Sequence, residues 1–253
     1  IPDGSGRLVV NDLRGVLYIT DESGRAPTEF MDMRTMDIGF DDSMFPNESG
    51  LVSVTFHPQF AEEGAPGYGK LYAAYSAGSA TGVADYLDDD AESHESVILE
   101  FTATDPAADE FSGTSREVFR IGQFAPNHNI GTLAFNPNAA PGSADFGMLY
   151  VCLGDGGAAH DPRDFGQSLE VPQAAIIRID PLGGEAGRGY GIPSDNPFVG
   201  QAGMAPEIWA SGLRHPQHFS WDTDGKMFIG DIGQNQIEEI NLGRAGANYG
   251  WRL

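Results

Sequence analysis

Three residues of this sequence carry side chains that suit catalysis. His128 lies just before the apolar run IGTLAF, Asp155 lies in the Gly-rich segment GDGG, and Arg214 lies in the Pro-bounded segment GLRHP. An imidazole serves as a general base near neutral pH, and a carboxylate on its other nitrogen fixes its tautomer. A guanidinium stabilises developing negative charge. Taken singly, each residue also has a structural explanation: a surface histidine, a turn-forming aspartate and an arginine that donates to backbone carbonyls.

Short β-strands must position these residues, because the chain repeats one pattern of strands and turns. Four imperfect units cover residues 7–33, 51–103, 117–181 and 207–243. Within them, period-two runs such as GVLYITD and GKLYAAYS are separated by clusters of Gly, Pro and Asp. Helical periodicity is almost absent. The pattern predicts an all-β fold, a single β-propeller domain over residues 1–253, with a β-sandwich as the structural alternative.

Composition excludes several classes of partner. The chain has 37 acidic and 14 basic residues and a net charge of −23, so neither nucleic acid nor an anionic membrane is an expected partner. The acidic excess indicates a solvated, salt-tolerant or secreted surface. Cys152 is the only cysteine, which excludes an internal disulfide and predicts a small buried hydrophobic residue. No apolar stretch is long enough to span a bilayer.

Three unusual segments follow one another within residues 206–251: PEIWASGLRHPQHFSWDTDG, MFIGDIGQNQIEEIN and GANYGW. With NHNIG and GDGG they resemble the soluble quinoprotein glucose/sorbosone dehydrogenases, six-bladed β-propellers of the aldose sugar dehydrogenase type. The resemblance covers residues 11–252. It implies oxidation of the anomeric carbon of an aldose or related sugar to a lactone, by hydride transfer to pyrroloquinoline quinone (PQQ). It further implies calcium as a second cofactor, an external electron acceptor, and a periplasmic or secreted location.

The resemblance also assigns roles to individual residues. It makes His128 the base that removes the proton of the anomeric hydroxyl, Asp155 its hydrogen-bond partner, and Arg214 the group that polarises the quinone oxygens. Glu48, in NESGLVSVTFHPQF, falls where a Gln or Glu approaches quinone and substrate; an exposed turn carboxylate is the alternative. His215 is a departure, since relatives commonly have an Asn there that contacts the cofactor. A histidine can still donate one hydrogen bond.

Calcium is implied by the segment DIGQNQIEEIN. In the family, successive backbone carbonyls bind the calcium that bridges to the quinone, and the matching positions are Gly233 and Gln234. Backbone oxygens suit a hard cation with six to eight oxygen ligands. A second, structural calcium in relatives corresponds to Glu239 and the carbonyl of Tyr249. The alternative for the acidic pair at 238–239 is a charged strand edge.

Two other functions stay open. A non-catalytic calcium-binding propeller that binds a glycan or protein partner would explain His215. A calcium-dependent lactonase-type hydrolase would hold its metal through side-chain carboxylates and amides rather than backbone carbonyls. Family members continue beyond NYGW with further blades, whereas this sequence ends at Leu253. We therefore expect about four blade-like units of a partial propeller, one that binds calcium but holds PQQ weakly or not at all.

Overall fold

The computed structural model describes residues 1–24, 26–43, 48–87, 93–184 and 187–252. Within these ranges the regular secondary structure is almost entirely β-strand, with two 3₁₀ turns at Met33–Thr35 and Phe165–Gln167. Its strands are β1 (Leu8–Asp12), β2 (Val16–Thr20), β3 (Thr28–Asp32), β4 (Leu51–Phe56), β5 (Lys70–Gly78), β6 (His94–Ala103), β7 (Gly113–Gln123), β8 (Ile130–Phe135), β9 (Leu149–Leu153), β10 (Ala175–Ile179), β11 (Ile208–Ser211), β12 (Pro216–Trp221), β13 (Met227–Asp231) and β14 (Glu239–Leu242).

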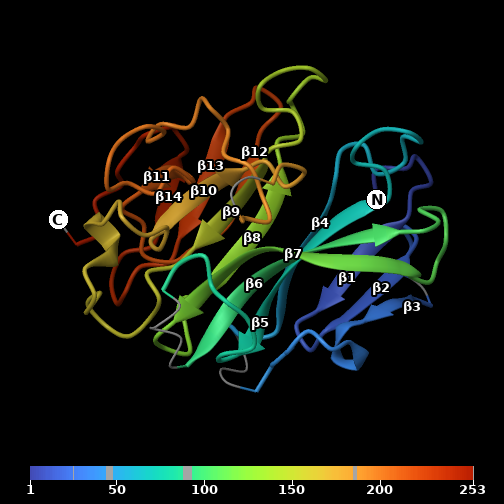
Figure 1. Cartoon of the computed structure of the whole chain (residues 1–253), viewed down its shortest axis with the longest axis horizontal. Helices are drawn as coiled ribbons and strands as arrows, with labels where there is room; N and C mark the ends of the chain where they lie inside the picture. The colour runs from blue at the N-terminus through green and yellow to red at the C-terminus, as the bar shows by residue number, and fades with distance from the viewer. Residues whose placement is uncertain (25, 44–47, 88–92, 185–186, 253) are drawn as a thin grey trace.

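These strands form four antiparallel sheets, each made of strands consecutive in sequence. Their orders are β1-β2-β3, β4-β5-β6-β7, β8-β9-β10-β11 and β12-β13-β14. The first strands of successive sheets lie against one another, β1 against β4, β4 against β8 and β8 against β12. Figure 1 shows the sheets following one another across the molecule, from the blue N-terminal sheet to the red C-terminal one. This is the arrangement of propeller blades.

Period-two alternation explains why the sheets stack. In β5, Leu71 and Ala73 pack into the core shared with the first sheet, whereas Tyr72 and Ala74 pack into the core shared with the third. The strand β9 alternates likewise, and Cys152 is wholly buried in the core shared with the fourth sheet. The middle strands β5 and β9 are therefore apolar on both faces, and each face is buried against a neighbouring sheet. The prediction of a buried, hydrophobic Cys152 is confirmed.

The predicted all-β class and the four repeating units are confirmed, but two unit boundaries were wrong. The run EVFRI belongs to β7, the last strand of the second sheet, and EIWAS belongs to β11, the last strand of the third. The repeat pattern had predicted each of them at the start of the following unit. A strand after a turn pairs with the strand before it, and the apolar pattern does not mark where the chain leaves a sheet.

Candidate functional site

The predicted catalytic and cofactor-binding residues lie on connections between strands, at one end of the sheets. Glu48 is on the link from β3 to β4, His128 on the link from β7 to β8, and Arg214 and His215 on the link from β11 to β12. Asp155 follows β9, and the predicted calcium segment follows β13. Because neighbouring antiparallel strands run in opposite directions, these links and connections all emerge at the same end. Sheet topology thus gathers residues that lie far apart in sequence.

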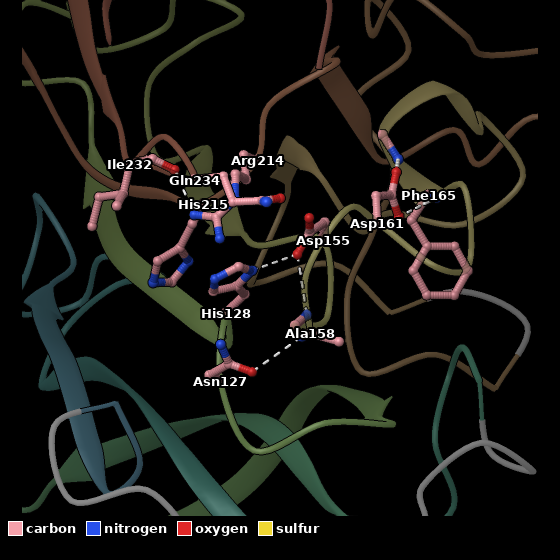
Figure 2. A network of polar contacts seen from close by, with 12 residues as sticks. Asn127, His128, Asp155, Ala158, Asp161, Phe165, Arg214, His215, Ile232 and Gln234 are labelled. Atoms are coloured by element: carbon pink, nitrogen blue, oxygen red, sulfur yellow. Dashed lines mark hydrogen bonds and ion pairs between the residues drawn. The ribbon is translucent and has the colours of Figure 1, made fainter. Parts of the chain in front are cut away.

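The His128 and Asp155 side chains are in direct contact. The Asp155 Oδ1 lies 2.6 Å from His128 Nδ1, and it also accepts a hydrogen bond from the Gly157 backbone N–H at 3.1 Å. The other carboxylate oxygen accepts from the Trp251 indole at 2.9 Å. Asp155 is fully buried. Figure 2 shows the His128 ring between Asp155 and His215. With Nδ1 bonded to a carboxylate oxygen, the ring carries its proton there and leaves Nε2 as the basic nitrogen.

The backbone around His128 is held in an uncommon conformation. His128 has φ 57°, in the left-handed region, and its N–H donates to Glu48 Oε2 at 2.7 Å. The first glycine of GDGG is needed here, because a Cβ on Gly154 would lie 2.3 Å from the His128 carbonyl oxygen. This close approach places the next residue, Asp155, against the imidazole. The motif supplies the carboxylate and also the space for the histidine.

Arg214 is fixed by its backbone and by two carbonyls. Its N–H donates to the Asp231 carboxylate at 2.9 Å, and its Nη1 donates to the carbonyls of Ile232 and Gly233 at 2.9 and 3.1 Å. Its Cζ lies 5.5 Å from the centre of the Trp251 ring. The buried Nε has no hydrogen-bond partner among the described residues. The guanidinium therefore keeps one buried donor available for a ligand.

A cavity of about 380 Å³ opens beside Arg214. Its lining includes Arg214, Gly233, Gln234, Glu239, Tyr249 and Trp251. The cavity thus brings together the arginine and all four predicted calcium positions. His128 and Asp155 adjoin this cavity rather than line it. They are joined to it by Trp251 and by the bond from the Asp155 N–H to the Arg214 carbonyl at 2.8 Å.

Glu48 and His215 also contact His128, Glu48 through the His128 N–H and His215 through its ring. The rings of His215 and His128 are stacked, with centroids 4.8 Å apart and planes 20° apart. His215 Nε2 is 3.4 Å from Glu48 Oε2, in a geometry that makes no hydrogen bond. Burial, with His128 and Arg214 nearby, lowers the pKa of His215 to about 3. Glu48 and His215 therefore lie beside His128, and neither lines the cavity beside Arg214.

The calcium positions have other contacts in this structure. Gln234 Oε1 accepts from the His160 N–H at 2.8 Å, Glu239 accepts from Asn241 at 3.2 Å, and the Tyr249 hydroxyl donates to the Leu242 carbonyl at 2.7 Å. Throughout the described ranges, no group of three or more His, Cys, Asp or Glu side chains could hold a metal ion. The lactonase alternative, which required a side-chain cluster, gains no support from these residues.

Two residues of the site escaped sequence reasoning. Trp251 donates to Asp155 and lies under Arg214, whereas the segment GANYGW had predicted a role for Tyr249 alone. Asp231 accepts the N–H groups of both Arg214 and His215, and burial raises its pKa to about 6. A signal for Asp231 was present, because it ends the run MFIGD much as Asp155 ends LYVCLGD. Asp231 is the last residue of β13 and Asp155 follows β9, so both lie where a middle strand ends at the same end of the fold.

Known proteins resemble this chain along most or all of its length. The HIPL1 protein of Arabidopsis thaliana is 30% identical, covering 100% of this chain and 40% of the relative. Aldose sugar dehydrogenase YliI of Escherichia coli is 25% identical, covering 100% of this chain and 57% of the relative. Hedgehog-interacting protein of Homo sapiens is 26% identical, covering 85% of this chain and 28% of the relative. The chain thus spans less than two thirds of these relatives.

A solved structure shares the fold. The PQQ-bound aldose sugar dehydrogenase from Streptomyces coelicolor superposes with a TM-score of 0.70 at 24% identity, covering 99% of this chain and 60% of that one. The predicted propeller fold is thereby confirmed. No helix in the described part of the chain is long and apolar enough to cross a membrane. The family model described as "Glucose / Sorbosone dehydrogenase" matches residues 1–253, and the chain therefore belongs to the glucose/sorbosone dehydrogenase family.

Proposed function

We propose that this chain carries the catalytic base and the cofactor-binding arginine of a PQQ- and calcium-dependent sugar dehydrogenase. The reaction converts the anomeric carbon of an aldose, or a related sugar, to a lactone and passes the electrons to an external acceptor. The observation that carries the proposal is the contact of 2.6 Å between His128 and Asp155, next to the cavity lined by Arg214. A carboxylate-held imidazole beside a buried cation suits removal of a proton and a hydride from one hydroxyl-bearing carbon.

In this mechanism His128 handles the proton. Its Nε2 accepts the proton of the anomeric hydroxyl, while Asp155 keeps the proton on Nδ1 and stabilises the imidazolium that forms. Only 6% of the His128 side-chain surface is exposed, so an edge of the ring is all that a sugar can reach. Such restricted access limits the number of water molecules around the basic nitrogen.

The cavity fits an anionic, planar cofactor. Arg214 presents a buried Nε with no partner among the described residues, and the Trp251 ring provides an aromatic wall. When bound, PQQ supplies the two-electron acceptor for the sugar hydride. Arg214 would hold the negative charge of that group, and its own position is fixed by Asp231 and by the carbonyls of Ile232 and Gly233.

Calcium at Gly233 fits under one condition. The Gly233 carbonyl accepts from Arg214 Nη1 at 3.1 Å. A carbonyl oxygen has a second lone pair for a cation, but the guanidinium repels a cation placed beside it. An anionic cofactor next to both would offset that repulsion. We therefore propose that Gly233 and Gln234 hold calcium in the presence of the quinone, whereas Glu239 and Tyr249 offer a second, weaker position on the same cavity.

The test is dye-coupled turnover with aldoses in the presence of PQQ and calcium. His128→Ala should lower kcat by roughly two to four orders of magnitude, the usual contribution of a positioned base. The matched control is His218→Ala, because His218 is exposed on β12 and should retain nearly full turnover. A loss of less than about tenfold in His128→Ala would reject the assignment of the base.

A second candidate function is binding without catalysis. The observation in its favour is the engagement of the Gly233 carbonyl by Arg214, together with a relative named as a Hedgehog-interacting protein. This alternative predicts that PQQ leaves the protein unchanged at any calcium concentration. A titration of the chain with PQQ, followed by quinone absorbance, decides between the two, since saturable binding that is lost in Arg214→Leu supports the dehydrogenase.

A further inference from the structure

The residue at which this chain departs from its family lies against the base. His215 is 4% exposed, and its backbone is fixed by the bond from its N–H to Asp231 at 2.7 Å. Its carbonyl accepts from the Ile232 N–H at 3.2 Å, and Pro216 follows at the start of β12. The ring is thus placed by the backbone, at the junction of two sheets. The backbone therefore also fixes the nearly parallel stack of this ring on His128.

The plane of the His215 ring, rather than its nitrogens, makes the contact. Neither Nδ1 nor Nε2 has a hydrogen-bond partner among the described residues. The nearest carboxylate oxygen, Glu48 Oε2, accepts from the His128 N–H at 2.7 Å. Burial and the neighbouring His128 and Arg214 keep the pKa of His215 near 3, so the ring is neutral at the working pH of a histidine base. A neutral ring stacks on His128 without charge repulsion.

We propose that His215 is a positioning residue, whose ring packs flat on the His128 imidazole and holds it in the orientation that Asp155 sets. The inference rests on the proposed role of His128 as the base. The bond to Asp155 fixes one ring nitrogen but leaves the ring free to tilt about it, and the stack removes that freedom. Small displacements of a catalytic group cost large factors in rate. An asparagine at this position cannot supply the same flat surface.

Three variants separate the ring plane from the ring nitrogens. His215→Phe keeps a flat ring and removes both nitrogens, so kcat should stay within about threefold of the parent. His215→Asn and His215→Ala lose the stack, and we expect kcat to fall about tenfold or more while KM changes less than about threefold. The proposal is overturned if the Phe variant loses as much as the Ala variant, or if the Asn and Ala variants keep full kcat.

A second readout does not need activity. Long-range ¹H–¹⁵N spectra of histidine-labelled protein report the tautomer of His128, whose signals are identified by their loss in His128→Ala. Every variant should keep the tautomer protonated on Nδ1, which Asp155 sets, but the Asn and Ala variants should show exchange broadening of the His128 ring signals that the parent and the Phe variant lack. Equally sharp His128 ring signals in all variants would overturn the proposal. Absent sugar oxidation with the predicted spectra would instead count against the dehydrogenase function alone.

Discussion

At the scale of single residues, the Asp155 carboxylate is held by three hydrogen-bond donors. It accepts from His128 Nδ1, from the Gly157 N–H and from the Trp251 indole, and it is fully buried. We expect Asp155→Asn to lower kcat by about 100-fold or more, because the amide turns an NH₂ group toward one of these donors and permits the wrong tautomer of His128.

The matched comparison for this prediction is Trp251→Phe. That change removes the indole donor to Asp155 Oδ2 and keeps an aromatic ring near Arg214, so kcat should fall by only about threefold to tenfold. Dye-coupled turnover measures both variants. A larger loss in the phenylalanine variant than in Asp155→Asn would show that the indole, rather than the carboxylate, controls the base.

Residue types and motifs predicted much of this site, but only where a motif names a side chain. The pairing of NHNIG with GDGG identified His128 and Asp155, and the structure brings them together. Trp251 and Asp231 escaped because their roles depend on which connections meet in space. A buried aspartate that accepts backbone N–H groups has the same local sequence as a turn residue, and three-dimensional proximity alone distinguishes them.

At the scale of elements, strands were predictable from alternation and the sheet boundaries were not. The runs in β5 and β9 are apolar on both faces, which indicates burial between two sheets. In contrast, β7 and β11 each follow a turn, and a strand that closes one sheet has the same local sequence pattern as a strand that opens the next. The difference matters for function, because the links that follow β7 and β11 carry His128, Arg214 and His215.

The first residue of β6 is a buried histidine, which links the second sheet to the site through a hydrogen bond with Asn129. His94 Nε2 lies 2.8 Å from Asn129 Oδ1, and the Asn129 amide donates to the Glu48 carbonyl. Burial lowers the pKa of His94 from 6.5 to about 4. Between these values the unfolded chain binds a proton that the folded chain does not, so the free energy of unfolding falls as pH drops from about 6.5 to about 4.

The size of this effect follows from the pKa difference. One pKa unit corresponds to about 1.4 kcal/mol, so His94 alone accounts for about 3 kcal/mol of acid destabilisation. His94→Gln keeps an amide donor for Asn129 and should flatten the pH dependence by that amount. Denaturant unfolding at pH 7, 5.5 and 4.5 measures it, with the exposed His218→Gln as control. Equal pH slopes in His94→Gln and the parent would contradict the prediction.

At the scale of the whole molecule, apolar packing between sheets and the charge of the surface affect stability separately. The sheets are held by apolar cores between neighbouring blades. Some of the basic residues are buried and already paired. Arg120 and Arg178 are each 3% exposed and form ion pairs with carboxylates. Among the described residues six carboxylates are buried against three arginines, so the exposed surface keeps most, but not more, of the acidic excess that gives the net charge of −23.

The acidic side chains on the surface repel one another, and salt should weaken this repulsion. Raising NaCl from 10 mM to 1 M shortens the Debye length from about 30 Å to about 3 Å, which screens exposed charges and leaves the buried pairs largely unchanged. We expect a gain of at least 1 kcal/mol, or about 2–4 °C in Tm for a chain of this size. The control is the same salt series at pH 4.3, the pI of the chain, where the net charge vanishes and the gain should disappear. A Tm that rises equally with salt at pH 7 and at pH 4.3 would show that preferential exclusion of salt, rather than screening of acidic residues, stabilises the fold.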